Sequence, residues 1–238
     1  MLEAVGGEIV PDEHNGSLPR HRHNLSREQV ADSQSARIIN AAIELFGTRG
    51  YAATTVMDIA KGAGVSRKTF YEMFDSKQDV VVAAYRAFDR WLRDAGMVPR
   101  NPGEVAPSAD LARVCLALLT LLSHTPAATR MFFLEVLGAG EEVRRRRDAA
   151  IARFVDEATP GMQALRAQLS PDLPPLSRTT VHVLVGGLHE MIVHHLVHHS
   201  AATLPDLAEE MNRLVFAVVA PTVNQHEFPD AVPGRTDL

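Results

Sequence analysis

The residues best suited to binding chemistry lie between positions 54 and 77. Hydroxyl, phenol and cationic side chains are the usual hydrogen-bond donors to phosphate oxygens and base edges. This stretch supplies eight of them: Thr54, Thr55, Ser66, Arg67, Lys68, Thr69, Tyr71 and Lys77. Between residues 33 and 80, six Lys or Arg stand against five Asp or Glu, so the net charge there is only +1. Any nucleic-acid binding must therefore depend on where the donors are placed rather than on bulk charge.

The pattern around these donors predicts two short helices joined by a tight turn. Apolar residues at helical spacing follow Thr55, Gly64 supplies the turn, and Ser66 precedes a second apolar pattern anchored by Phe70 and Phe74. Glycine suits such a turn because a positive φ costs it nothing, and serine is a favoured helix N-cap. This is the layout of a helix-turn-helix, whose second helix lies in the major groove of DNA.

Helical periodicity continues through most of the chain, and no stretch alternates with the two-residue period of a strand. The first helix is expected to begin at residue 33, and Ser76 is expected to cap a fourth helix that runs to about Ala95. Pro160 is expected to kink or split the seventh helix. The predicted fold class is all-α, with about nine helices in an N-terminal helix-turn-helix domain and a C-terminal helical domain. The five helices after the fourth are predicted at 108–123, 126–139, 141–168, 177–200 and 204–220.

Composition shifts divide the chain into four expected parts. These are a flexible arm at 1–32, the helix-turn-helix domain at 33–80, a C-terminal domain at 81–222 and a flexible tail at 223–238. The second half of the arm is basic, so it is either a disordered tail or an arm that touches DNA.

The overall composition excludes several classes of protein. The net charge of −5 does not indicate a strongly basic nucleic-acid binder, and a hydrophobic content of 46% favours a globular fold. No apolar run approaches the roughly 18 residues of a membrane span, and the N-terminus does not resemble a secretion signal. The single cysteine, Cys115, cannot form an internal disulfide, which fits a reducing cytoplasm.

From the first helix onward the sequence resembles the TetR family of regulators. The resemblance is carried by Ala41-Ala42, Leu45-Phe46, Gly50-Tyr51, Thr54-Thr55-Val56, Ile59-Ala60, Ala63-Gly64-Val65-Ser66, Thr69-Phe70-Tyr71, Phe74 and Lys77. It implies a homodimer that binds a palindromic double-stranded DNA operator through its first three helices, and whose last two helices form the dimer interface. It also implies phosphate contacts from Thr54 or Thr55, Tyr71 and Lys77, and base contacts from Arg67, Lys68 and Thr69.

The resemblance further implies a pocket for a small-molecule effector among the fourth to eighth helices. Its candidate lining residues are aromatic or Met: Phe88, Trp91, Met131, Phe132, Phe133 and Phe154. Few charges share these faces, so we expect a mainly apolar ligand, although residues of this kind at helical spacing are more often core. The expected dimer interface comprises Gly186, Leu188, Ile192, Leu196, Leu207, Met211, Leu214 and Val218.

A histidine cluster offers an alternative chemistry. His194 and His198 are four residues apart, as are His195 and His199, so each pair shares a helix face and could bind one metal ion. Nothing beside them completes a tetrahedral ligand set, and a surface or interface cluster is the simpler interpretation. We therefore predict no metal and no cofactor.

The sequence favours a DNA-binding regulator over an enzyme. A metal-dependent helical enzyme built on the histidine cluster would need a carboxylate–histidine ligand set, and the chain also lacks a nucleophile elbow and a phosphate loop. Within DNA binding, a repressor released by its ligand is the first interpretation. An activator or dual regulator with the same fold stays open, because the operator's position relative to the promoter decides between them.

Overall fold

The computed structural model describes residue 9 and residues 26–95 and 111–221. Within them, nine α-helices and two 3-10 helices account for all regular structure, and the predicted all-α class is confirmed. Their bounds are α1 (Arg27–Arg49), α2 (Val56–Gly62), α3 (Arg67–Met73), α4 (Lys77–Asp94), α5 (Leu111–Ser123), α6 (Pro126–Phe133), η2 (Glu135–Gly138), α7 (Glu141–Leu169), α8 (Arg178–His198), η3 (Ala201–Leu207) and α9 (Ala208–Val219).

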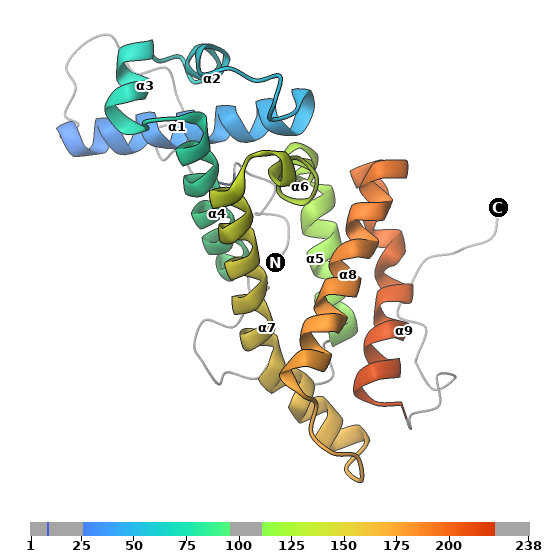
Figure 1. The fold of residues 1–238 in the computed structure, drawn as a ribbon. Coiled ribbons are helices and arrows are strands. Elements are labelled where there is room, and N and C mark those ends of the chain that lie inside the picture. Colours follow the sequence, from blue (N-terminus) through green and yellow to red (C-terminus); the bar gives the residue numbers. More distant parts are fainter. Residues whose placement is uncertain (1–8, 10–25, 96–110, 222–238) are drawn as a thin grey trace.

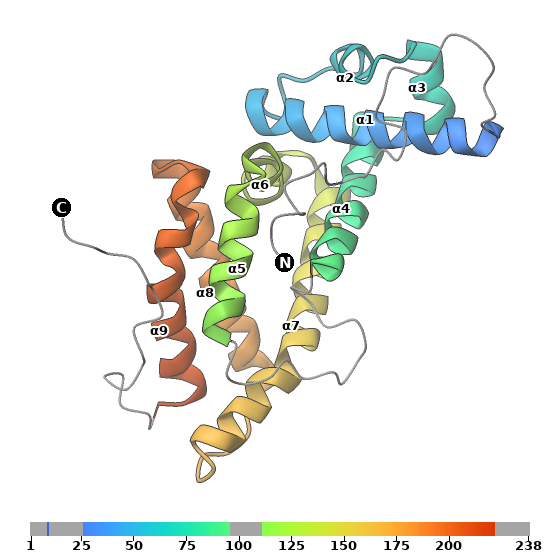
Figure 2. The same ribbon diagram turned by 180° about the vertical axis from the view of Figure 1, so that it is seen from behind.

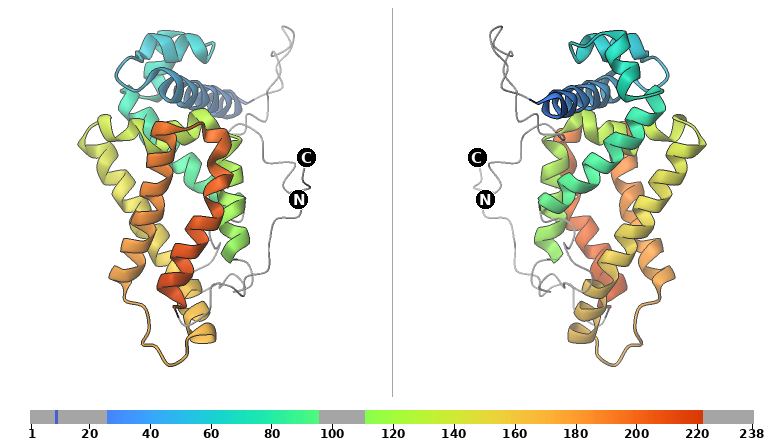
Figure 3. Two further views of the ribbon diagram at one scale, coloured as in Figure 1. Left: turned by 90° about the vertical axis from the view of Figure 1, so that its right-hand side faces the viewer. Right: turned by 90° about the vertical axis from the view of Figure 1, so that its left-hand side faces the viewer.

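The helices form a bundle with a cap across one end. Helix α1 lies across the top with α2 and α3 above it, and α4 descends from this cap into the bundle (Figure 1). From behind, α5 lies beside α9 (Figure 2). Helices α8 and α9 stand side by side on one outer face of the molecule (Figure 3). Among the described helices, none combines the length and apolar character needed to cross a membrane.

The first helix begins earlier than the sequence pattern indicated. Ser26 accepts a hydrogen bond from the Gln29 amide, and the Gln29 side chain accepts one from the Ser26 amide, at 3.1 and 2.8 Å. This reciprocal capping box starts α1 at Arg27, so residues 27–32 are helical and do not belong to an arm. The hydrogen bonds of this capping box start the helix among residues that show no apolar periodicity. The rest of the predicted arm, apart from residue 9, lies outside the described residues, as does the predicted tail beyond 221.

Three later boundaries also differ from the expectation. Helix α7 is continuous through Pro160 and is not split, and its lower part bends aside in Figure 1. Helix α6 ends at Phe133 and is followed by the 3-10 turn η2, where one helix to 139 was expected. The last predicted helix is divided into η3 and α9, because Pro205 lies inside a 3-10 segment.

The core of the cap is continuous with part of the bundle. Phe46 in α1, Phe70 in α3 and Trp91 in α4 belong to one buried cluster together with Met131 and Val136 from α6 and η2. The predicted domain boundary at residue 80 falls inside α4, which passes through this shared core. The helices of the cap and the α6–η2 segment are therefore packed as one unit.

The contact between α1 and α6 is unusually close. A Cβ added at Gly47 would lie 1.9 Å from the carbonyl oxygen of Ala127, so only glycine fits there. Nearby, the Glu135 carboxylate accepts a hydrogen bond of 3.0 Å from the Tyr51 amide, and the Gln78 side chain donates one of 3.1 Å to the carbonyl of Ala139. These contacts fix the cap on the bundle.

Candidate nucleic-acid interface

The turn between α2 and α3 is closed by backbone hydrogen bonds around one glycine. Gly64 has φ +64°, a conformation in which side chains with a Cβ are strained. The Val65 amide donates to the Ala60 carbonyl and the Gly64 amide to the Lys61 carbonyl, at 3.0 and 3.2 Å. This pair of bonds is a Schellman motif with Gly64 at its left-handed position. It ends α2 and sets the direction in which α3 leaves the turn.

Side-chain caps fix the first turns of both helices. Thr55 and Asp58 form a capping box at the start of α2, in which the Thr55 hydroxyl also donates to the Asp58 carboxylate at 2.6 Å. The hydrogen bonds from Thr55 hold the pKa of Asp58 below its usual range. At the start of α3 the Ser66 hydroxyl accepts from the Thr69 amide at 3.0 Å. Thr55, Ser66 and Thr69 therefore act first as local braces for the two helices.

The exposed side of α3 carries the cations of the interface. The Arg67 guanidinium lies over the Tyr71 ring, 5.5 Å from its centroid, and Tyr71 is 44% exposed. Lys68 lies 3.7 Å from Glu72 in an exposed pair, which water screens strongly. Arg67, Lys68 and Tyr71 thus share an accessible surface, and the carboxylate of Glu72 is partly neutralised by Lys68.

Two of the predicted phosphate contacts are used inside the protein. Thr54 is buried, and its hydroxyl donates to the Gly50 carbonyl at 2.9 Å. The Lys77 ammonium donates to the carbonyls of Tyr51 and Thr54 at 2.7 and 2.9 Å, and lies 4.2 Å from the centroid of the Tyr51 ring. Burial also lowers the pKa of Lys77. Both residues hold the connection between α1 and α2, which the sequence pattern did not reveal.

One exposed residue of the interface was not singled out from the sequence. Met57, in the first turn of α2, is 57% exposed although it is apolar. The helical pattern could have indicated this exposure, because Val56 and Ile59 occupy the inward positions of α2 and Met57 does not. An exposed methionine beside a cationic helix suits contact with sugar or thymine methyl groups.

The predicted effector residues fall in two places. Phe88 stacks on Phe132 at 4.2 Å and on Trp91 at 5.6 Å between ring centroids, and Phe133 stacks on the imidazole of His189 at 5.0 Å. Met131 is buried in the same cluster as Phe132 and Trp91. Phe154 packs against a different cluster, between α7, α8 and α9. The structure thus brings five of the six residues close to one another and leaves Phe154 apart.

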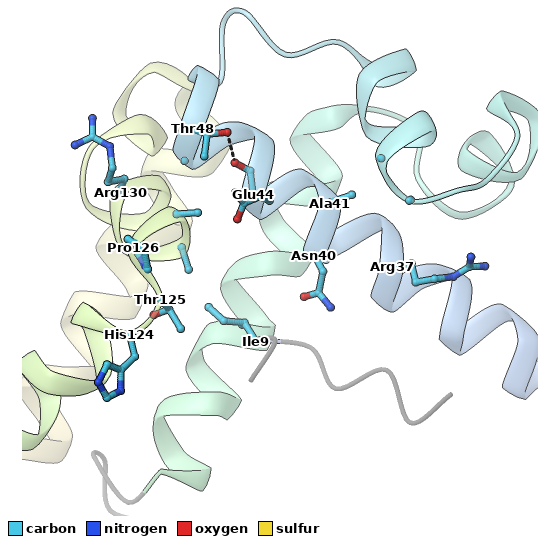
Figure 4. A pocket seen from close by; sticks show the side chains of 15 residues that line it. Ile9, Arg37, Asn40, Ala41, Glu44, Thr48, His124, Thr125, Pro126 and Arg130 are labelled. Atoms are coloured by element: carbon cyan, nitrogen blue, oxygen red, sulfur yellow. Dashed lines mark hydrogen bonds between the residues drawn. The ribbon is translucent and has the colours of Figure 1, made fainter. Parts of the chain in front are cut away.

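A groove of about 800 Å³ opens elsewhere, between α1 and the turn that joins α5 to α6 (Figure 4). Its lining is amphipathic, and none of the six predicted effector residues contributes to it. Within it the Thr48 hydroxyl donates to the Glu44 carbonyl at 2.6 Å. The lining residues are Ile9, Arg37, Asn40, Ala41, Glu44, Gly47, Thr48, Gly62, Ala63, His124, Thr125, Pro126, Ala127, Ala128 and Arg130.

Several predicted dimer residues point into the protomer. Ile192, Leu196 and Met211 are at most 3% exposed and form a core cluster with α5 and η3. Leu188 and Leu207 pack against that cluster, and Leu188 and Val218 against its neighbour. Gly186 is half-buried and Leu214 is 39% exposed, and Val183 and Val197 of α8 are 69% and 60% exposed.

The histidine pairs of α8 differ in their surroundings. The His195 ring is buried, and its Nε2 lies 2.9 Å from the Thr203 hydroxyl. His194 and His198 are exposed, with ring centroids 4.6 Å apart. In the part of the chain that the structure describes, no group of three or more His, Cys, Asp or Glu is arranged to hold a metal ion.

Comparison with known proteins places the helix-turn-helix in a defined family. Residues 38–84 match the family model for bacterial regulatory proteins of the tetR family. The chain is 26% identical over 132 residues to the biofilm operon icaADBC HTH-type negative transcriptional regulator IcaR of Staphylococcus aureus, covering 51% of this chain and 69% of IcaR. It is 30% identical over 142 residues to the HTH-type transcriptional regulator EthR of Mycobacterium tuberculosis, covering 60% of this chain and 58% of EthR.

Solved structures share the whole architecture at low sequence identity. The fatty acid degradation regulator FadR from Bacillus halodurans has a TM-score of 0.63 at 17% identity, over 79% of this chain and 96% of FadR. The TetR-family regulator PfmR from Thermus thermophilus has a TM-score of 0.58 at 18% identity, over 80% and 97% of the two chains. Together with the N-cap and turn geometry of α2 and α3, these findings assign residues 38–84 to the DNA-binding domain of the TetR family of regulators, and the fold of the chain is that of the solved regulators.

Proposed function

We propose that this protein is a homodimeric repressor that binds a palindromic operator and releases it when a small ligand binds the C-terminal domain. The observation that carries the proposal is the exposed face of α3, where Arg67, Lys68 and Tyr71 lie together on a helix braced at its N-terminus by Ser66. Arg67 and Lys68 donate to guanine edges or phosphates in this proposal, and Tyr71 donates to a phosphate. Such a regulator works beside the chromosome, in the cytoplasm.

The proposed division of labour follows the predicted domains, with the N-terminal boundary moved to Ser26. Residues up to about 80 bind DNA, and residues 81–222 bind the effector and the second copy. A dimer must hold its two α3 helices about 34–36 Å apart to reach successive major grooves. A ligand that binds better to a dimer with another spacing lowers DNA affinity by that difference.

We propose that dimerisation uses the outer face of α8 and α9. Exposed Val183, Val197 and Leu214 lie on these helices, which stand side by side in Figure 3. A Cβ added at Gly186 or Gly187 would meet nothing within 4 Å, so these glycines leave room for a second backbone to approach. The buried residues Ile192, Leu196 and Met211 support this face from inside.

The proposed effector binds beside the aromatic cluster of α4 and α6. Phe88 and Phe133 are only half-buried there, and burial lowers the pKa of His189, which stacks on Phe133. His189 is thus a neutral ring at pH 7, compatible with a mainly apolar ligand.

DNA binding is tested with the DNA upstream of the protein's own coding region in an electrophoretic shift assay. Arg67→Ala is expected to weaken specific binding about tenfold and to relax the sequence preference, because a base contact is lost. Tyr71→Phe is expected to weaken binding evenly across sequences. Arg153→Ala, which removes an exposed charge on α7 and outside the helix-turn-helix, is the matched control and should bind as the wild type does. Unchanged affinity and preference in Arg67→Ala would refute the base-reading role.

Repression is tested separately by in vitro transcription from the bound promoter. A repressor lowers transcript yield when it binds, and an activator raises it. This assay distinguishes the two regulators that share the fold, and neither outcome alters the assignment of α3 as the DNA-reading helix.

A further inference from the structure

The apolar interior of the bundle is not a single cluster. Phe88 and Phe133 pack against both the first cluster, which includes the cap, and the third, formed by α5, α8, η3 and α9. Leu188 similarly joins the second and third clusters. All three residues remain half-buried although they lie between cores. Cores usually merge within a domain, so these three partly accessible residues mark a seam where the clusters meet.

Two polar atoms beside this seam are buried without partners. The hydroxyl of Tyr85, on α4, and the Nε of Arg147, on α7, have no hydrogen-bond partner. The Tyr85 ring lies edge-on to Phe132, with centroids 5.1 Å apart, which places it next to the Phe88–Phe132 stack. The Arg147 charge is near enough to act on both Tyr85 and His189. Buried polar groups almost always find partners, so these two orphaned atoms, on residues that interact electrostatically, require an explanation.

Both orphaned atoms are hydrogen-bond donors. A guanidinium Nε–H can only donate, and burial raises the pKa of Tyr85 so strongly that its phenol keeps its proton. Two other ionisable groups interact with these residues. The largely exposed carboxylate of Asp148 accepts a hydrogen bond of 3.2 Å from Arg147 Nη1. Glu190 acts electrostatically on His189. One nitrogen of the Arg147 guanidinium is therefore hydrogen-bonded to Asp148, while its Nε–H has no acceptor.

We propose that the effector is an amphipathic carboxylic acid, whose carboxylate accepts hydrogen bonds from Tyr85 Oη and Arg147 Nε and whose apolar body lies against Phe88, Phe132 and Phe133. The inference rests on the proposed function, and it names the ligand class of that regulatory site. A carboxylate supplies the two acceptor lone pairs that the two donors need, and a charge-assisted bond to arginine is among the stronger polar contacts in proteins. Because Tyr85 is on α4, the ligand contacts the helix that carries the DNA-binding cap.

The test uses calorimetric titration of the purified full-length chain with matched pairs of probes. Octanoate and octanol share an alkyl body, and phenylbutyrate and phenylbutanol share an aromatic one. The acid of at least one pair is expected to bind about tenfold or more tightly than its alcohol, as the loss of a charge-assisted hydrogen bond implies. The alkyl and aryl arms distinguish fatty acids from aromatic acids. Equal affinity of acid and alcohol in both pairs, or no binding by either acid, overturns the proposal.

Two variants connect the preference to the named atoms. Tyr85→Phe and Arg147→Met should each remove most of the difference between acid and alcohol, while Tyr71→Phe, on the DNA-binding face, should keep it. Because the Tyr85 hydroxyl is unpartnered in the free protein, Tyr85→Phe should leave its thermal midpoint unchanged or raise it. A lower midpoint combined with an unchanged acid preference would show that the hydroxyl serves only the fold, and would overturn the assignment. Should Tyr85→Phe not fold, Arg147→Met decides the question alone.

Calorimetry without DNA keeps this proposal separate from the proposed function. If the acids do not bind but α3 still recognises an operator, the regulator stands and the ligand class is wrong. If the acids bind at Tyr85 and Arg147 but no operator is recognised, the ligand site stands and the proposed repressor fails.

Discussion

The sequence pattern predicts the position of Lys77 at the start of the fourth helix, but its ammonium binds backbone carbonyls of the protein. It lies in the first turn of α4, where the helix dipole disfavours a cation. The carbonyls of Tyr51 and Thr54 and the face of the Tyr51 ring offset that cost. The ammonium thereby ties the connection after α1 to the start of α4, across sequence separations of 26 and 23 residues.

Replacing Lys77 with Met is expected to destabilise the protein even without DNA. The change removes two part-buried hydrogen bonds from a cation to backbone carbonyls, so the free energy of unfolding should fall by about 1–3 kcal/mol. Chemical denaturation of the DNA-free protein measures it. Lys68→Met is the matched control, because its only ion pair is exposed, and its effect should stay within about 0.5 kcal/mol. If the two variants are equally stable, the hydrogen bonds of Lys77 do not stabilise the fold.

At the scale of elements, local signals such as the cap at Ser66 could be read from the sequence, apart from the Ser26–Gln29 capping box, and distant ones could not. The cap at Ser66 has its partner three residues away, so residue type and spacing predict it. Helix α8 is different, because apolar residues occur on all its sides. Val183 is 69% exposed while Leu196 is 1% exposed, and only the packing of neighbouring helices separates the two. For the same reason, the residues predicted for the dimer interface include both buried core residues and exposed ones.

Replacing glycine with alanine is expected to have opposite effects on stability in the α2–α3 turn and inside α7. Gly64→Ala should lower the free energy of unfolding by about 1–2 kcal/mol, because φ at this position is +64°. Gly161→Ala lies inside α7 with nothing within 4 Å of the added Cβ, and should raise stability by about 0.5–1 kcal/mol through helix propensity. Guanidinium melts of both variants provide the measurement. A stabilising Gly64→Ala would show that the turn tolerates another conformation.

At the scale of the whole molecule, the cap and the bundle are joined by contacts of different kinds. Gly47 permits a backbone approach to Ala127, Glu135 accepts from the Tyr51 amide, and Gln78 donates to Ala139. Each joins a segment of the cap or the start of α4 to α6, to η2 or to the residue that follows η2. A ligand that displaced α6 or η2 would have to break or carry along these contacts, which is how the proposed ligand response would reach the helices of the cap.

The dimer face is tested by a charge placed on α8. Val197→Glu should convert the protein to a monomer, because a carboxylate would be buried between two copies without a partner. Light scattering after size-exclusion chromatography reports the mass. Leu116→Glu alters an exposed apolar residue of α5, which is 39% exposed, and should leave the mass unchanged. If Val197→Glu keeps the wild-type mass, the interface lies on another face.

The shared core predicts that the DNA-binding helices do not fold alone. A fragment of residues 26–95 would lose the α5, α6 and η2 side chains that cover Phe46 and Trp91, among them Met131 and Val136. Exposing each large apolar side chain costs about 1.5–3 kcal/mol, and a chain of about 70 residues has little stability to spare. Circular dichroism should therefore show a broad, weakly cooperative melt for this fragment and a sharp one for the full chain. A fragment extended to residue 145 regains those covering side chains and should melt more cooperatively. A sharp transition in the short fragment would mean that the cap is an independent domain. Contacts such as that of Glu135 with Tyr51 would then connect two separate domains, and would not be part of one common core.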